Sequence, residues 1–137
     1  MNEARVAFYG DSYTLGIGAT STGRRWSTII CAERGWREFN PSVNGLGFVR
    51  NRRNFGDGDL PSQIIASNPD IVFVALGLND NFGFAEQSDR IRVQISTDFE
   101  YLRLALQGQF SLSRLAWWTA SLAPEAAWET WGRVRGR

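Results

Sequence analysis

The pattern of hydrophobic positions predicts three parallel β-strands. Arg5 to Tyr9 forms a short, largely apolar stretch, and residues 71–76 are an unbroken run of apolar and β-branched side chains. Such a run is typical of a central parallel strand that is covered on both faces. A third stretch alternates weakly, with apolar residues at Phe39, Pro41 and Val43. Because proline removes a backbone donor, we expect this stretch at an edge or at the end of its strand.

Between these strands, apolar side chains recur at helical spacing of three and four residues. The predicted helices cover residues 22–34, 59–67 and 88–106. Ser21 or Thr22, Asp59 and Ser88 are their expected N-caps, and Gly35 is the expected end of the first helix. Strands that alternate with helices predict an α/β fold with a parallel sheet and right-handed crossovers.

The character of the chain changes after Leu106. Residues 107–137 hold four of the six tryptophans and lack a continuous apolar strand. The apolar run from Leu115 to Trp118 has no interpretable period. We therefore divide the chain into a domain of residues 1–106 and an atypical Trp- and Arg-rich tail of residues 107–137. A tail of this kind over an incomplete sheet predicts self-association, because an uncovered strand edge pairs readily.

Composition narrows the range of functions. The chain has 137 residues, a net charge of +1, a single cysteine (Cys31) and no histidine. The near-neutral charge argues against nucleic acid or anionic membrane as a partner. One cysteine excludes an internal disulfide, and the lack of histidine removes the usual general base and the commonest zinc ligand. No signal-like or transmembrane-length apolar run is present, so we expect a soluble cytoplasmic protein.

Candidate chemistry gathers where the three predicted strands end. Gly10-Asp11-Ser12 follows the first strand, Gly45 follows the second, and Gly77-Leu78-Asn79-Asp80 follows the third. The carboxyl ends of parallel strands meet at one edge of a sheet, which is where open α/β sheets bind ligands. A serine hydroxyl, two backbone amides and an asparagine amide at one point would supply a nucleophile and an oxyanion hole.

These three blocks resemble those of the SGNH hydrolases, also called GDSL-type lipases and esterases. The matching residues are Gly10-Asp11-Ser12, then Gly45 within Val43-Asn44-Gly45-Leu46-Gly47, and then Gly77-Leu78-Asn79-Asp80. The resemblance implies a three-layer α/β/α sandwich with a flavodoxin-like sheet of order 2-1-3-4-5. It also implies acyl transfer to Ser12, with the Ser12 and Gly45 amides and the Asn79 side chain as oxyanion hole. Gly10, Asp11, Gly77 and Asp80 would support this site.

The resemblance further implies a small ester or acetylated carbohydrate as substrate, and no cofactor or metal. The family's fourth block, Asp-x-x-His after the last strand, has no counterpart because the chain contains no histidine. The fourth and fifth strands are also unrecognisable, as in a truncated or frameshifted member of the family. Without that histidine we expect weak activity or none. Asp11 and Asp80 are expected to bond the neighbouring main chain rather than replace it.

Two other functions remain open. The hydroxyl-rich loop from Ser12 to Thr22 lies where a flavodoxin-like module holds phosphate or flavin, although Asp11 and an incomplete GxGxxG pattern oppose this. A non-catalytic binding remnant is the second alternative. Arg50, Arg52 and Arg53 could bind an anionic group, but a solvated loop is the favoured interpretation.

Overall fold

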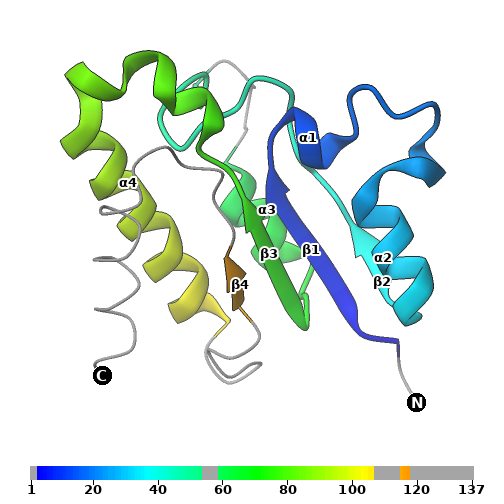
Figure 1. Cartoon of the computed structure of the whole chain (residues 1–137). Coiled ribbons are helices and arrows are strands. Elements are labelled where there is room, and N and C mark those ends of the chain that lie inside the picture. Colours follow the sequence, from blue (N-terminus) through cyan, green and yellow to red (C-terminus); the bar gives the residue numbers. More distant parts are fainter. Residues whose placement is uncertain (1–2, 54–58, 107–114, 118–137) are drawn as a thin grey trace.

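The protein is a three-layer α/β/α sandwich, as predicted (Figure 1). The computed structural model describes residues 3–53 and 59–106, and the backbone of 115–117. In chain order the elements are β1 (Arg5–Gly10), α1 (Ser12–Leu15), η1 (Thr22–Arg24), α2 (Trp26–Arg34), β2 (Arg37–Phe39), α3 (Leu60–Ala66), β3 (Ile71–Ala75), η2 (Leu78–Gly83), α4 (Phe84–Ala105) and β4 (Leu115–Trp117).

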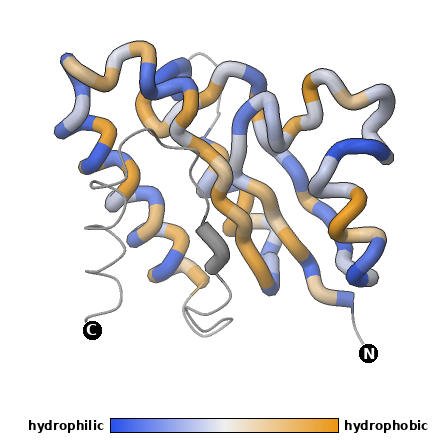
Figure 2. The backbone as a smooth tube through the Cα atoms, in the orientation of Figure 1, coloured by the Kyte–Doolittle hydropathy of each residue, from blue (hydrophilic) through white to orange (hydrophobic). Residues whose placement is uncertain are grey.

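All strands of the described sheet are parallel, in the order β2-β1-β3-β4. This agrees with the first four places of the order that the family resemblance implied. Strand β1 pairs with β3 from Val6 opposite Ile71 to Gly10 opposite Ala75. These two central strands consist largely of hydrophobic residues (Figure 2). Strand β2 lies at one edge, as predicted, but it ends at Phe39, before Pro41.

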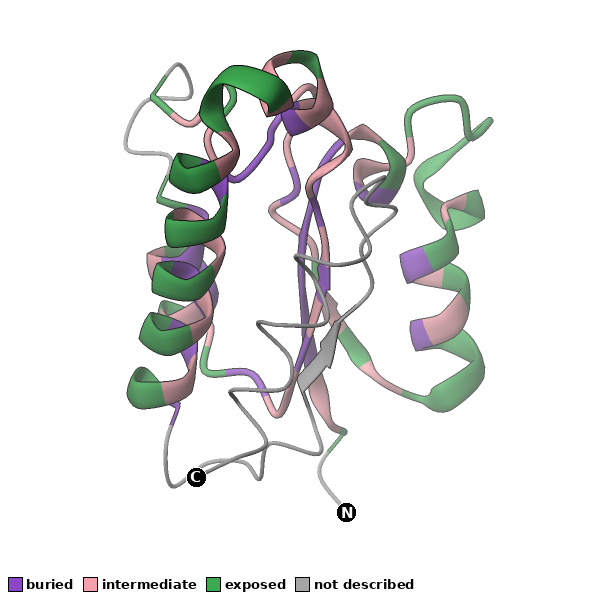
Figure 3. Cartoon of the chain, turned by 60° about the vertical axis from the view of Figure 1, so that its left-hand side comes forward, coloured by how far each residue is buried: buried purple, intermediate pink, exposed green. Residues whose placement is uncertain are grey.

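Helices cover both faces of the sheet (Figure 3). On one face, α3 and α4 pack on β1 and β3 through a cluster that includes Ala7, Tyr9, Ile64 and Leu102. On the other face, Cys31 of α2 packs against Val6 and Phe8 of β1, with Phe73 of β3 beside them. Because successive residues of β1 point to opposite faces, the single strand contributes to both clusters.

The structure corrects several predictions of secondary structure. Helix α2 begins at Trp26 after a separate 3₁₀ turn, and neither Ser21 nor Thr22 caps it. Helix α4 begins at Phe84 rather than at Ser88, and it is kinked at Gln87. The prediction of no strand after Leu106 is wrong for Leu115–Trp117, which pairs in parallel with β3 from Val72 opposite Leu115. Phe110-Ser111-Leu112-Ser113 and Trp118 lie outside the described residues.

Candidate active site

Ser12 lies at a sharp turn from strand β1 into helix α1. A Cβ atom at Gly10 would come within 3.0 Å of the Ala75 carbonyl and would collide with Thr14, so only glycine fits there. Asp11 caps the helix by accepting a hydrogen bond from the Tyr13 N–H at 3.0 Å. The helix lasts a single turn and ends at Gly16, with φ of +92°. Ser12 is half-buried at the first position of this turn. Strand, tight turn and short helix therefore place Ser12 at the carboxyl edge of the sheet.

Asn79 connects all three sequence blocks. It lies in η2, directly after β3, and its side-chain amide donates to the Leu46 carbonyl at 2.8 Å and to the Asp11 carboxylate at 3.4 Å. Leu46 adjoins Gly45, and Asp11 adjoins Ser12. The loops that carry Ser12, Gly45 and Asn79 therefore meet at one point. The contact to Asp11 is long and therefore weak, so the amide hydrogen that makes it can turn to another acceptor at low cost.

Asp80 holds the loop that follows β2. Its buried carboxylate accepts hydrogen bonds from three consecutive backbone amides, those of Phe48 at 2.6 Å, Val49 at 3.0 Å and Arg50 at 3.0 Å. A Cβ atom at Gly47 would lie within 2.6 Å of this carboxylate, so the close approach requires glycine. With three donors already bound, Asp80 is a fixed structural acceptor.

Two further glycines allow the loop geometry. Gly45 has φ of +77° and Gly77 has φ of +122°, a region in which side chains are strained. The Gly45 carbonyl accepts a hydrogen bond from the Asn51 side chain at 2.9 Å. This bond turns the carbonyl into the loop. Gly45 and Gly77 therefore allow the backbone turns of the two loops that the Asn79 side chain joins.

Asp11 is the second buried carboxylate of this edge, with 3% of its surface exposed. Burial raises its pKa above the ordinary aspartate value, against the opposing effect of the Tyr13 N–H. Its two recorded contacts, to Tyr13 and to Asn79, join the Ser12 turn to η2. Asp11 thus serves the geometry of the site as a main-chain and amide acceptor, in line with its expected role.

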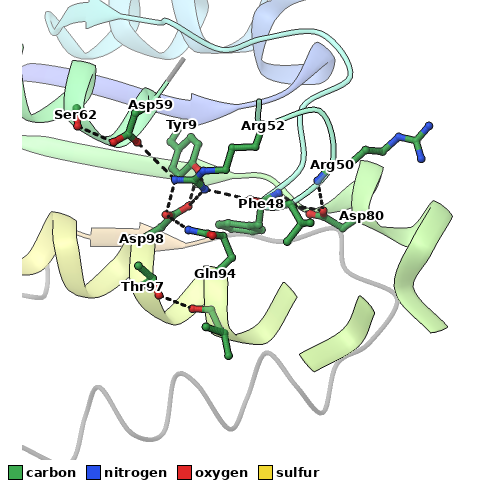
Figure 4. Close-up of polar contacts among 12 residues, drawn as sticks. Tyr9, Phe48, Arg50, Arg52, Asp59, Ser62, Asp80, Gln94, Thr97 and Asp98 are labelled. Atoms are coloured by element: carbon green, nitrogen blue, oxygen red, sulfur yellow. Dashed lines mark hydrogen bonds and ion pairs between the residues drawn. The ribbon is translucent and has the colours of Figure 1, made fainter. Parts of the chain in front are cut away.

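A buried ion network that sequence reasoning missed lies behind the site (Figure 4). Arg52 forms a bidentate pair with Asp98 of α4, at 2.6 and 2.8 Å, and donates to the Phe48 carbonyl at 3.1 Å. Asp98 also accepts from the Tyr9 hydroxyl at 2.6 Å and from Gln94 at 2.9 Å. The solvated-loop interpretation is therefore wrong for Arg52. No local signal in the sequence pairs it with a residue 46 positions later.

The network shifts two pKa values. Burial, strengthened by Asp98, raises the pKa of Tyr9 well above its ordinary value. Burial alone would lower the pKa of Arg52, but its bonds to Asp98 outweigh this and raise it. Both groups therefore keep their neutral-pH protonation states, and the network holds the loop of residues 45–53 against α4.

Neither a metal cluster nor a membrane span emerges from the described part of the chain. In residues 3–53 and 59–106, no three histidine, cysteine, aspartate or glutamate side chains come together as a metal site requires. The helices of these same residues are all too short or too polar to span a bilayer.

Comparison with known proteins identifies the fold. No family model and no curated protein matches this sequence. Among solved structures, TesA superposes with a TM-score of 0.67 at 20% identity, over 95% of this chain and 72% of TesA. A GDSL-like lipase from Parabacteroides merdae gives 0.56 at 14% identity, over 86% of this chain and 59% of that one. An acetylxylan esterase from Geobacillus stearothermophilus gives 0.54 at 18% identity, over 77% and 57%.

The chain therefore has the fold of the SGNH hydrolases, as its sequence blocks led us to expect. It spans less than two thirds of the Parabacteroides and Geobacillus proteins.

Proposed function

We propose that this chain is an ester hydrolase of SGNH type that transfers an acyl group to Ser12. The observation that carries the proposal is the Asn79 amide, which reaches the Leu46 carbonyl and the Asp11 carboxylate and so joins the three loops at the carboxyl edge of the sheet. A site assembled from strand-end loops is where this class of sheet binds its ligand.

In the proposed reaction the Ser12 hydroxyl oxygen attacks the ester carbonyl carbon and gives its proton to solvent, which later returns a proton to the departing alcohol. The carbonyl oxygen becomes an anion that receives hydrogen bonds from the Ser12 N–H, the Gly45 N–H and the Asn79 side chain. Collapse of this intermediate expels the alcohol and leaves an acyl group on Ser12. Water then attacks the acyl-enzyme by the same route and releases the acid. Asn79 would exchange its weak contact with Asp11 at 3.4 Å for the bond to the oxyanion.

Each half-reaction also needs a base for the attacking hydroxyl and an acid for the leaving group. The 137 residues contain no histidine for this task. Asp80 is bound by three backbone amides, and Asp11 by Tyr13 and Asn79. Loss of a triad member typically removes ~10⁴-fold of rate, equivalent to about 5.5 kcal/mol of barrier. We therefore propose that this chain by itself turns over esters slowly.

The substrate class we propose is a small ester or an acetylated carbohydrate. Two of the similar structures support it: one is an acetylxylan esterase, and another is described as a carbohydrate esterase whose active site has catalytic and non-catalytic binding functions. Because of the second structure, binding of the ester without turnover stays an alternative function.

The test uses p-nitrophenyl acetate with the purified chain, the Ser12→Ala variant and, as a matched control, Ser96→Ala on the exposed surface of α4. Imidazole is added because it supplies a base of near-neutral pKa. We expect turnover barely above background without imidazole. With imidazole, the wild type and Ser96→Ala should hydrolyse the ester faster than Ser12→Ala does. The rate with Ser12→Ala reports hydrolysis of the ester by imidazole alone. Equal rates for all three proteins would contradict acyl transfer at Ser12. If the rates are equal and the chain instead binds flavin saturably, the flavodoxin-like alternative is favoured.

A further inference from the structure

A small pocket lies beside the Asp80 loop, between this loop and the start of helix α4. It has a volume of about 170 Å³ and is lined by Val49, Arg50, Asp80, Gly83, Gln87, Arg90 and Ile91. We call it the arginine pocket. A single water needs only about 10–15 Å³ by this measure, so the pocket admits a group of several heavy atoms.

Two arginines, Arg50 and Arg90, are among the residues that line the arginine pocket. Among the described residues, neither Arg50 nor Arg90 forms an ion pair with a carboxylate. By contrast, ion pairs are formed by Arg25, Arg52 and Arg103. Arg50 extends away from the Arg52 network (Figure 4), and its guanidinium lies over the Phe82 ring at 4.9 Å. Contact with the ring restricts the arginine side chain, so less rotational freedom is lost when it binds a ligand.

The lining holds one carboxylate, that of Asp80, and it forms no ion pair with either arginine. The Asp80 carboxylate is already bound by the amides of Phe48, Val49 and Arg50. On α4, Gln87, Arg90 and Ile91 occupy one helix face at spacings of three and four residues. Glu86 and Asp89 belong to the same helix but do not line the pocket. The lining therefore holds two arginines and one carboxylate, and planar guanidinium groups match the geometry of carboxylate and phosphate groups.

The pocket is built from the same loops as the proposed active site. Asp80 follows the Asn79 amide directly, and Val49 and Arg50 belong to the loop that Gly45 begins. We propose that the arginine pocket binds an anionic oxygen group, a carboxylate or a phosphate, carried by the ester that the Ser12 site processes. The assignment of this anion to a substrate rests on the proposed function; the binding of the anion does not.

Anion binding is measured first, without turnover. The full-length ¹⁵N-labelled chain is titrated with sodium succinate and, separately, with inorganic phosphate at constant ionic strength. We expect saturable chemical-shift changes centred on Val49, Gly83, Gln87 and the arginine side chains. Arg50→Ala and Arg90→Ala should each weaken binding by roughly tenfold or more, because each removes charge-assisted hydrogen bonds. Arg92→Ala, an exposed arginine of α4 outside the lining, is the matched control and should bind as the wild type does.

Absence of saturable shifts, shifts centred elsewhere, or equal weakening by Arg92→Ala would overturn the proposal. Because Arg50 and Arg90 are exposed, their variants should fold, and unchanged thermal melts confirm this. Preference between succinate and phosphate distinguishes the two sources of anion. Ser12→Ala should retain anion binding, so failure of acyl transfer and failure of this pocket are separate results.

The substrate link is tested with imidazole present. We expect the p-nitrophenyl half-ester of succinate to show a lower KM than p-nitrophenyl acetate. Arg50→Ala should remove most of this difference, whereas Arg92→Ala, outside the lining, should retain it. Equal KM values for the two esters in the wild type would show that the anion bound in the pocket does not belong to the substrate.

Discussion

Breaking the Arg52–Asp98 pair should destabilise the protein more than any exposed substitution. The Asp98 side chain is 3% exposed and that of Arg52 is 22% exposed. Asp98 accepts four hydrogen bonds, two from Arg52 and one each from Tyr9 and Gln94. Removing the carboxylate in Asp98→Ala leaves the Arg52 guanidinium with only the longer ion pair to the exposed Asp59, at 3.5 Å. The buried Tyr9 hydroxyl and the half-buried Gln94 amide also lose this acceptor. Removal of one partner of a buried pair costs about 3–5 kcal/mol.

The same reasoning makes the double variant informative. Replacing both charges by apolar residues of similar volume, as in Arg52→Met with Asp98→Leu, leaves no unpaired buried charge and is often neutral or stabilising. Urea and thermal unfolding measure both variants. For a chain of this size, Asp98→Ala should lower Tm by roughly 10–20 °C. The double variant should recover most of this loss.

Two results would refute the reasoning. A loss below about 1 kcal/mol in Asp98→Ala is typical of a solvent-screened surface pair and would mean that the network is not buried in solution. A double variant as unstable as the single one would show that the loss arises from packing or from the Tyr9 and Gln94 hydrogen bonds rather than from an unpaired charge.

Two further predictions concern Gly47 and Glu38. In Gly47→Ala, the new Cβ would meet the Asp80 carboxylate, which three amides hold in place. We therefore expect the free energy of unfolding to fall by about 1–3 kcal/mol and the NMR resonances of the loop to shift. An unperturbed NMR spectrum would contradict this. For Glu38, burial would raise the pKa, but hydrogen bonds from two hydroxyls and Arg25 outweigh it and lower the pKa below 4.5. Its stabilisation is therefore present above pH 4.5 and lost as pH falls through the lower folded pKa, so the Tm difference between wild type and Glu38→Gln should shrink in acid; a constant difference would exclude this.

The sequence predicted the features that depend on local pattern. Strand β3, Ile71–Ala75, lies within the unbroken apolar run at residues 71–76, and the glycine at position 35 ends α2 in a left-handed conformation. The three motif blocks lie where strand-end logic placed them, because the ends of parallel strands share one edge. Roles for Ser12, Gly45 and Asn79 in catalysis remain predictions that kinetics must test.

Features that depend on contacts between residues far apart in the sequence could not be predicted from local pattern. The helical spacing of Trp26 and Ile29 in the sequence predicts that both lie on the buried face of helix α2, but they are 39% and 44% exposed. Ser27 is buried in their place because its hydroxyl donates to Glu38 of β2 at 2.6 Å. A polar residue appears misplaced on a helix wheel until its partner on another element is known. The short β4 was missed for a similar reason, since three residues carry too little pattern to specify a strand.

The nucleophile is the centre of this account, and mass spectrometry tests it most directly. The chain is incubated with a fluorophosphonate in the presence of imidazole and digested, and the modified peptide is sequenced, with Ser12→Ala and Ser96→Ala treated in parallel. We predict one phosphonyl adduct, on Ser12, formed faster with imidazole, absent from Ser12→Ala and retained in Ser96→Ala. An unlabelled wild-type chain, or an adduct that persists in Ser12→Ala at the same rate, would contradict the assignment of Ser12 as nucleophile.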